Sequence, residues 1–113
     1  MDNLSIQTTI ANGGVAVVII VGRLDSETSP MLDTELTKVV GGNVKLVLDL
    51  KDVEYMSSAG IRAIVKAAQT AQKSGGGVRL ACAPESVKTI LYTVGLLEKV
   101  QTYPTVNEAV ASF

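Results

Sequence analysis

The chain has 113 residues, 47% of them hydrophobic and 19% charged, with ten basic and eleven acidic side chains and a net charge of −1. This composition predicts one globular domain spanning residues 1–113, and it argues against disorder, a basic nucleic-acid-binding surface and a membrane-spanning helix. The sequence has no histidine and one cysteine, Cys82, so histidine-dependent catalysis, a zinc cluster and an internal disulfide are excluded.

Two strands joined by a tight turn are predicted at the start of the chain. Residues 6–10 and 15–21 are rich in Val, Ile and Thr, and Asn12-Gly13-Gly14 between them suits the positive φ angles of a hairpin. The N-terminal Met1-Asp2-Asn3 does not open a charged and then apolar leader. No signal peptide and a cytoplasmic location are therefore expected.

Strands and helices then alternate. Ser29-Pro30 predicts a helix with Ser29 as its N-cap, and Gly41-Gly42 predicts its end. Residues 44–50 are mostly Val and Leu and predict the central strand, followed by a connector over residues 51–56. The next helix is predicted from near Ser58 to about Ser74, with an apolar face formed by Ile61, Ile64, Val65 and Ala68.

The last third of the chain continues the same alternation. Gly75-Gly76-Gly77 follows a helix and precedes a strand at residues 78–82, so it indicates a turn rather than a phosphate-binding loop. A third helix is predicted between Pro84 and Gly95, then a weak strand at residues 100–103 and a short helix introduced by the capping-box spacing of Thr105 and Glu108. The third helix has an apolar face of Val87, Ile90, Leu91 and Val94.

The resulting order is β-β-α-β-α-β-α-β-α. It predicts an α/β fold in which an opening hairpin is followed by parallel strands, giving a mixed sheet with helices packed against it.

Two adjacent serines, Ser57 and Ser58, stand at the predicted start of the second helix. Serine is the preferred N-cap residue, so a capping role is one interpretation. The other is a phosphorylation site, because the unpaired N–H groups of a helix start favour an anion. The carboxylates Asp49 and Asp52 lie nearby, but acidic residues at a strand end commonly cap or face water, so catalysis by them is not expected.

The stretch around these serines resembles the signature of the anti-sigma factor antagonists, which are built on the STAS domain. Three further segments resemble the family, and together the resemblance covers nearly all of the chain. The matching signature residues are Asp49-Leu50, Val53, Tyr55-Met56, Ser58 and Gly60-Ile61, and the further segments are Gly22–Asp25, Gly75–Val78 and Val94–Leu96.

The resemblance implies a mechanism of partner switching. Antagonists of this family bind an anti-sigma factor that is also a serine kinase, which frees the sigma factor. The kinase then phosphorylates the antagonist, and a serine phosphatase reverses the modification. The resemblance places the acceptor at Ser58 and implies a regulator of transcription with no enzymatic activity, cofactor or metal, acting as a monomer or weak dimer without nucleic-acid or membrane partners.

The sequence departs from the family pattern beside the acceptor. Ser57 replaces the usual Asp and is a second candidate hydroxyl, and Ala59 replaces a Ser or Thr. Arg62 replaces a small residue four positions after Ser58, on the same helical face, and is expected to neutralise part of a phosphate there. The predicted partner-binding residues are Asp25, Ser57, Ser58 and Arg62, although Asp25 suits a loop cap equally well.

Three alternatives remain at this stage. A STAS scaffold or sensor subunit of a bacterial signalling complex would bind partners without being phosphorylated, and Ser57 and Ser58 would then only cap the helix. The STAS portion of an anion transporter is disfavoured because the chain starts at Met1 without a spanning segment. A small enzyme is disfavoured by the missing histidine and phosphate-binding motifs.

Overall fold

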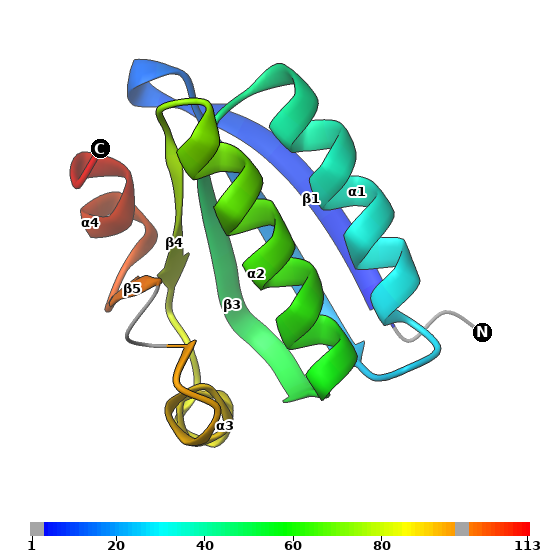
Figure 1. Ribbon diagram of the computed structural model, residues 1–113. Coiled ribbons are helices and arrows are strands. Elements are labelled where there is room, and N and C mark those ends of the chain that lie inside the picture. Colours follow the sequence, from blue (N-terminus) through cyan, green and yellow to red (C-terminus); the bar gives the residue numbers. More distant parts are fainter. Residues whose placement is uncertain (1–3, 97–99) are drawn as a thin grey trace.

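A five-stranded mixed sheet forms the framework of the computed structural model, which describes residues 4–96 and 100–113 (Figure 1). Residues 1–3, on which the absence of a leader was predicted, lie outside the described residues. The elements are β1 (Leu4–Ala11), β2 (Val15–Leu24), α1 (Ser29–Gly42), β3 (Lys45–Met56), α2 (Ser58–Lys73), β4 (Gly77–Ala81), α3 (Glu85–Thr93), β5 (Gln101–Tyr103) and α4 (Val106–Ala111).

The strands lie in chain order from β1 to β5, and the predicted topology is confirmed. β1 is antiparallel to β2, while β2, β3, β4 and β5 run parallel. The hairpin turn Asn12–Gly14 is a single 3₁₀ turn in which Gly13 and Gly14 have φ angles of +77° and +75°. β3 occupies the middle of the sheet, so the Val- and Leu-rich segment is the central strand, as expected for a strand buried on both faces.

Two hydrophobic clusters lie on opposite faces of the sheet. α1, α2 and α3 pack on one face, where the larger cluster gathers side chains such as Leu36, Leu48 and Ile64. α4 packs on the other, where a smaller cluster joins Val17, Val47 and Ala109. Figure 1 shows α1 and α2 side by side across the sheet and α4 beyond β4 and β5. The carboxyl ends of the parallel strands therefore meet at one edge, next to the start of α2.

β3 is longer than the sequence predicts. Residues 51–56, predicted to be a connector, continue the strand. They do so because β2 also runs on to Leu24 and pairs with them, with register shifts between Ile19 and Val21 and between Gly22 and Arg23. The charged side chains are exposed while the apolar residues among them are buried. As a result, Ser57 follows the strand directly.

The turn between α2 and β4 depends on a glycine. A Cβ atom at Gly76 would lie 1.9 Å from the carbonyl oxygen of Val44, which itself accepts a hydrogen bond from the N–H of Gly77 at 2.8 Å. No side chain larger than hydrogen fits at this position. Gly75 and Gly76 therefore lie in the predicted turn, Gly77 begins β4, and Gly76 allows the backbones before β3 and β4 to approach each other.

Two local predictions are wrong. Ser29 is the first residue of α1 rather than its N-cap, and it is buried, with 3% of its surface exposed. Its hydroxyl donates to the carbonyl oxygen of Asp25, and this hydrogen bond links the start of the helix to the preceding loop. Val94, expected on the core face of the third helix, is 52% exposed because α3 ends at Thr93 and the helical periodicity no longer applies.

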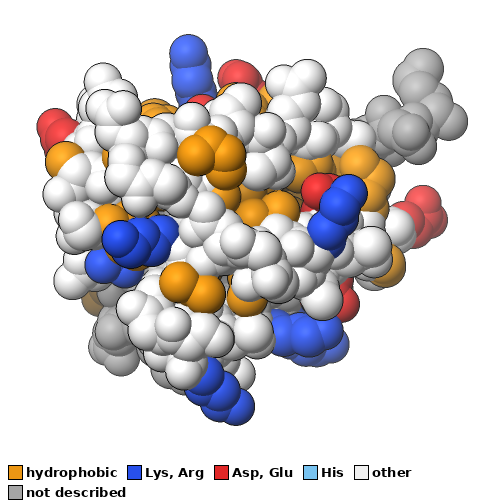
Figure 2. Space-filling view, turned by 90° about the horizontal axis from the view of Figure 1, so that it is seen from above, with side chains coloured by type: hydrophobic (Ala, Val, Ile, Leu, Met, Phe, Trp, Pro, Cys, Tyr) orange, Lys and Arg blue, Asp and Glu red, His pale blue; other side chains and the backbone are white. Residues whose placement is uncertain are grey.

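Among residues 4–96 and 100–113, no helix is long and apolar enough to cross a membrane. The same residues contain no group of three or more His, Cys, Asp or Glu side chains placed to hold a metal ion. On the face shown in Figure 2, the lysine and arginine side chains stand apart from one another instead of forming one basic patch.

Candidate functional site

The first turn of α2 gives its two serines different environments. Ser57 is the N-cap, with an extended backbone (φ −87°, ψ 171°), and its Oγ accepts a hydrogen bond from the N–H of Gly60 at 3.4 Å. Ser58 is the first helical residue and is exposed. Its hydroxyl makes no hydrogen bond to any residue that the structure describes. Capping therefore falls to Ser57, which leaves the Ser58 hydroxyl open to solvent.

The first turn of α2 is fixed against the loop between β2 and α1. The N–H of Ser57 donates to the carbonyl oxygen of Leu24 at 2.7 Å. Gly60 is buried so closely that a Cβ there would lie 3.1 Å from Cβ of Leu24 and 3.4 Å from Oγ of Ser29. These contacts set the position of Ser58 relative to the loop that begins at Asp25.

Asp25 caps the loop that leads into α1. Its Oδ1 accepts hydrogen bonds from the N–H groups of Thr28 (2.9 Å) and Glu27 (3.0 Å) and from the hydroxyl of Thr28 (3.1 Å). The backbone N–H of Thr28 contributes most to holding the pKa of Asp25 below its usual value, and the opposing effect of desolvation is smaller. The loop-cap interpretation of Asp25 agrees with these contacts, whereas its contact with a partner stays a prediction.

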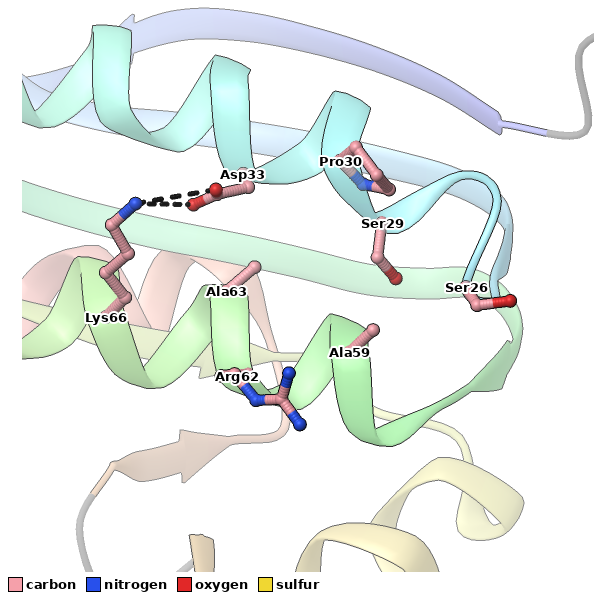
Figure 3. Close-up of a pocket in the computed structure, with 8 residues that line it drawn as sticks. All are labelled: Ser26, Ser29, Pro30, Asp33, Ala59, Arg62, Ala63 and Lys66. Atoms are coloured by element: carbon pink, nitrogen blue, oxygen red, sulfur yellow. Dashed lines mark hydrogen bonds and ion pairs between the residues drawn. The ribbon is translucent and has the colours of Figure 1, made fainter.

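A groove of about 350 Å³ lies between the N-terminal halves of α1 and α2 (Figure 3). An ion pair crosses it, with Nζ of Lys66 3.3 Å from Oδ1 of Asp33. Arg62 also lines the groove, and its guanidinium is directed toward the first turn of α2, on the side of Ala59. The lining residues are Ser26, Ser29, Pro30, Asp33, Ala59, Arg62, Ala63 and Lys66.

An exposed arginine–tyrosine pair lies at the same edge of the sheet. Arg23 and Tyr55 are register partners in β2 and β3, and the guanidinium carbon of Arg23 is 4.9 Å from the centroid of the Tyr55 ring. Because the next partners, Leu24 and Met56, are buried, Arg23 and Tyr55 project from the opposite face of the sheet. Sequence reasoning missed this pair, since it appears only once the two strands are known to be in register.

The structure brings the four predicted partner-binding residues to one edge. Asp25 follows the carboxyl end of β2, Ser57 and Ser58 follow that of β3, and Arg62 lies one turn further along α2. No hydrogen bond joins Ser58 to Asp25 or Arg62 among the described residues. Sequence reasoning missed Thr28, and it assigned Ser29 to a capping role. In the structure the hydroxyls of both residues complete the loop, by donating to the carbonyl oxygens of Arg23 and Asp25. The three-residue spacing of Asp25 and Thr28, typical of a capping pair, was the available signal.

Other residues considered from the sequence have structural roles. Oδ1 of Asp49 accepts from the N–H of Lys51 at 3.1 Å, which is a local cap, and Asp52 is exposed. Cys82 has a φ angle of 58°, is half-buried and packs with the cluster beneath α4.

Known proteins share both the sequence and the fold of this chain. The model of the STAS domain matches residues 7–109. The anti-sigma-F factor antagonist RsfB of Mycobacterium tuberculosis is 31% identical over 109 residues, which cover 93% of this chain and 87% of RsfB. The crystal structure of an anti-sigma factor antagonist from Mycobacterium paratuberculosis superimposes with a TM-score of 0.84 at 25% identity, over 96% of this chain and 92% of that one.

The antagonist SpoIIAA shares the fold at lower identity. Its unphosphorylated form superimposes with a TM-score of 0.80 at 15% identity, over 94% of this chain and 93% of that one. Its phosphorylated form, from Bacillus, superimposes with a TM-score of 0.74 at 14% identity, over 96% and 98% of the two chains. The match of the STAS domain model over residues 7–109 shows that the chain belongs to the STAS domain family. The resemblance to the anti-sigma factor antagonists that its sequence predicted is confirmed by the match to RsfB.

Proposed function

We propose that this protein is an anti-sigma factor antagonist that binds a serine-kinase anti-sigma factor and is released when the kinase phosphorylates Ser58. The observation that carries the proposal is the exposed, uncommitted hydroxyl of Ser58 at the first position of α2. Ser57 is the weaker acceptor because its oxygen already caps the helix. The similarity to RsfB and the fold of SpoIIAA, which exists in a phosphorylated form, support this function.

A phosphate at Ser58 is compatible with the folded chain but not with a tight complex. The helix start carries a partial positive charge, and a phosphoserine adds roughly −1.5 to −2 charges. In a complex, the same dianion must lose its water or displace the partner. A loss of about 3 kcal/mol of binding free energy would weaken binding more than a hundredfold. The switch therefore requires no rearrangement of the fold.

The test replaces Ser58 and measures binding to the purified kinase-type anti-sigma factors of the same organism. We expect Ser58→Asp to weaken binding more than a hundredfold, and Ser58→Ala to bind like the wild type but to resist release by ATP. Ser74→Asp, the same change just after the other end of α2, serves as the control. Intact-mass measurement after incubation with kinase and ATP counts the phosphates added.

Equal binding by Ser58→Asp and Ser58→Ala would contradict the proposal. Binding without any gain in mass would instead favour an unphosphorylated STAS scaffold. A gain in mass that survives in Ser58→Ala but not in Ser57→Ala would move the acceptor to Ser57.

The remaining features of the proposed function follow from this cycle. A serine phosphatase restores the unmodified protein. Residues 1–113 act as a single STAS domain in the cytoplasm, where sigma factors and their regulators meet. The protein works as a monomer or weak dimer through protein partners, without a catalytic activity of its own.

A further inference from the structure

The groove between α1 and α2 contains a positive charge that its other lining residues do not balance. Asp33 and Lys66 neutralise each other across the groove. Arg62 makes no ion pair or hydrogen bond within the described part of the chain, and it is exposed. The other lining residues, Ser26, Ser29, Pro30, Ala59 and Ala63, are uncharged. The groove thus offers a fixed apolar wall and one guanidinium with all its donors available.

Arg62 also lies within reach of the phosphorylation site. It is four residues after Ser58, so both side chains emerge from the same face of α2. Helical side chains lean toward the N-terminus of their helix, and Figure 3 shows the guanidinium of Arg62 directed toward the first turn. The same guanidinium can therefore bind a group in the groove or a phosphate on Ser58.

We propose that Arg62 is a shared cation, which binds a carboxylate of the anti-sigma factor while Ser58 is unmodified and is taken over by the phosphate after phosphorylation. The inference rests on the proposed function and names the chemistry of the partner. The partner places an Asp or Glu side chain in the groove, with its aliphatic part against Pro30, Ala59 and Ala63. A guanidinium binds both carboxylate and phosphate in a bidentate manner, so the exchange replaces one good ligand with another.

This exchange makes phosphorylation act twice on the complex. The new dianion is repelled by the partner's carboxylate, and the cation that held the carboxylate is withdrawn. An arginine at this position therefore strengthens the effect of phosphorylation on binding, whereas an alanine here would leave only the repulsion between the phosphate and the partner's carboxylate.

The phosphate part of the exchange is tested without any partner. Phosphoserine is installed at position 58 during translation, and the phosphate is titrated by phosphorus NMR. We expect Arg62→Ala to raise the pKa of the phosphate by about 0.3, because the arginine favours the dianion. Lys73→Ala, which removes the same charge from the last turn of α2, should leave that pKa unchanged.

The partner part is tested by titrating the unmodified variants against the anti-sigma factor that the wild type binds. We expect about tenfold weaker binding for Arg62→Ala and a larger loss for Arg62→Glu. Arg62→Lys should recover part of the affinity, and Lys73→Ala should bind like the wild type. A carboxylate-to-arginine change in the partner that restores binding to Arg62→Glu would identify the paired residue.

The outcomes separate this inference from the proposed function. If Ser58→Asp abolishes binding while the Arg62 variants bind and titrate like the wild type, the shared cation is refuted and the proposed function stands. If the wild type binds no anti-sigma factor, the proposed function and the shared-cation inference are both refuted. An unchanged phosphate pKa in Arg62→Ala alone also refutes the exchange, even when the variant binds more weakly.

Discussion

Replacing Gly76 by alanine tests how closely the segments before β3 and β4 must approach. An added Cβ would lie 1.9 Å from the carbonyl oxygen of Val44, whereas Cβ atoms essentially never lie within 3.0 Å of a heavy atom outside their own residue and its two chain neighbours. One of the two backbones must therefore move by about 1 Å or more. The carbonyl of Val44 also accepts the N–H of Gly77 at 2.8 Å, so this movement disrupts the hydrogen bond between the two segments.

The cost follows from these two effects. A buried backbone hydrogen bond that is lost without replacement costs about 1–3 kcal/mol, and the forced displacement of packed strands costs about 1–3 kcal/mol more. We expect Gly76→Ala to lower the free energy of unfolding by roughly 3 kcal/mol, which for a chain of this size lowers Tm by roughly 10 °C or more. Urea and thermal unfolding followed by far-UV circular dichroism measure both quantities.

Gly41→Ala is the matched control. Gly41 lies in α1, and a Cβ there would have no atom within 4 Å. The same substitution should stabilise the protein by up to about 1 kcal/mol, because alanine favours the helix. If Gly76→Ala unfolds at the same urea concentration as the wild type, the close approach at Val44 does not constrain the fold and the reasoning is refuted.

Four further substitutions test the site and the C-terminal helix. Ser57→Ala should cost about 1 kcal/mol of stability by removing the N-cap, whereas Ser58→Ala should change stability by less than about 0.5 kcal/mol; equal losses in urea unfolding would contradict this division. Asp25→Ala should destabilise the protein at neutral pH. The pKa of Asp25 is lowered in the folded state, so the contribution of its carboxylate to stability is complete above the ordinary value of 3.8 and is lost as the pH falls through the folded-state pKa. The difference in Tm between the wild type and Asp25→Ala should therefore become smaller in acid, and a difference that does not change with pH would contradict this role. Arg79→Ala removes a guanidinium 4.1 Å above the Phe113 ring and should cost about 1–2 kcal/mol, with faster amide exchange in α4; unchanged exchange would exclude this role.

The order and type of the helices and strands were predictable from local signals. Glycine pairs, apolar periodicity and the Thr105–Glu108 spacing each act over a few residues, and the Oγ of Thr105 does accept the N–H of Glu108 at 3.1 Å. The extension of β3 was not predictable, because charged residues there are held in a strand by pairing with β2, which depends on contacts distant in sequence.

The candidate site also has parts that depend on local sequence and parts that depend on contacts distant in sequence. Ser58 and Arg62 were found because they share one helix, where a spacing of four residues fixes their relation. The Arg23–Tyr55 pair depends on strand register, and the groove depends on how α1 packs against α2. Neither is encoded in a short segment. The difference between Ser57 and Ser58 required one further fact, the residue at which α2 begins.

The direct passage from β3 into α2 limits which kinases could carry out the proposed phosphorylation. Ser58 sits on a rigid corner, held by the Ser57–Leu24 hydrogen bond and by the contact of Gly60 with Leu24. An enzyme that threads an extended peptide through its active site would have to unravel this corner first. A kinase that phosphorylates Ser58, as proposed above, must instead accept the folded surface, so a synthetic peptide spanning residues 48–66 should be a very poor substrate even though it contains every residue of the signature.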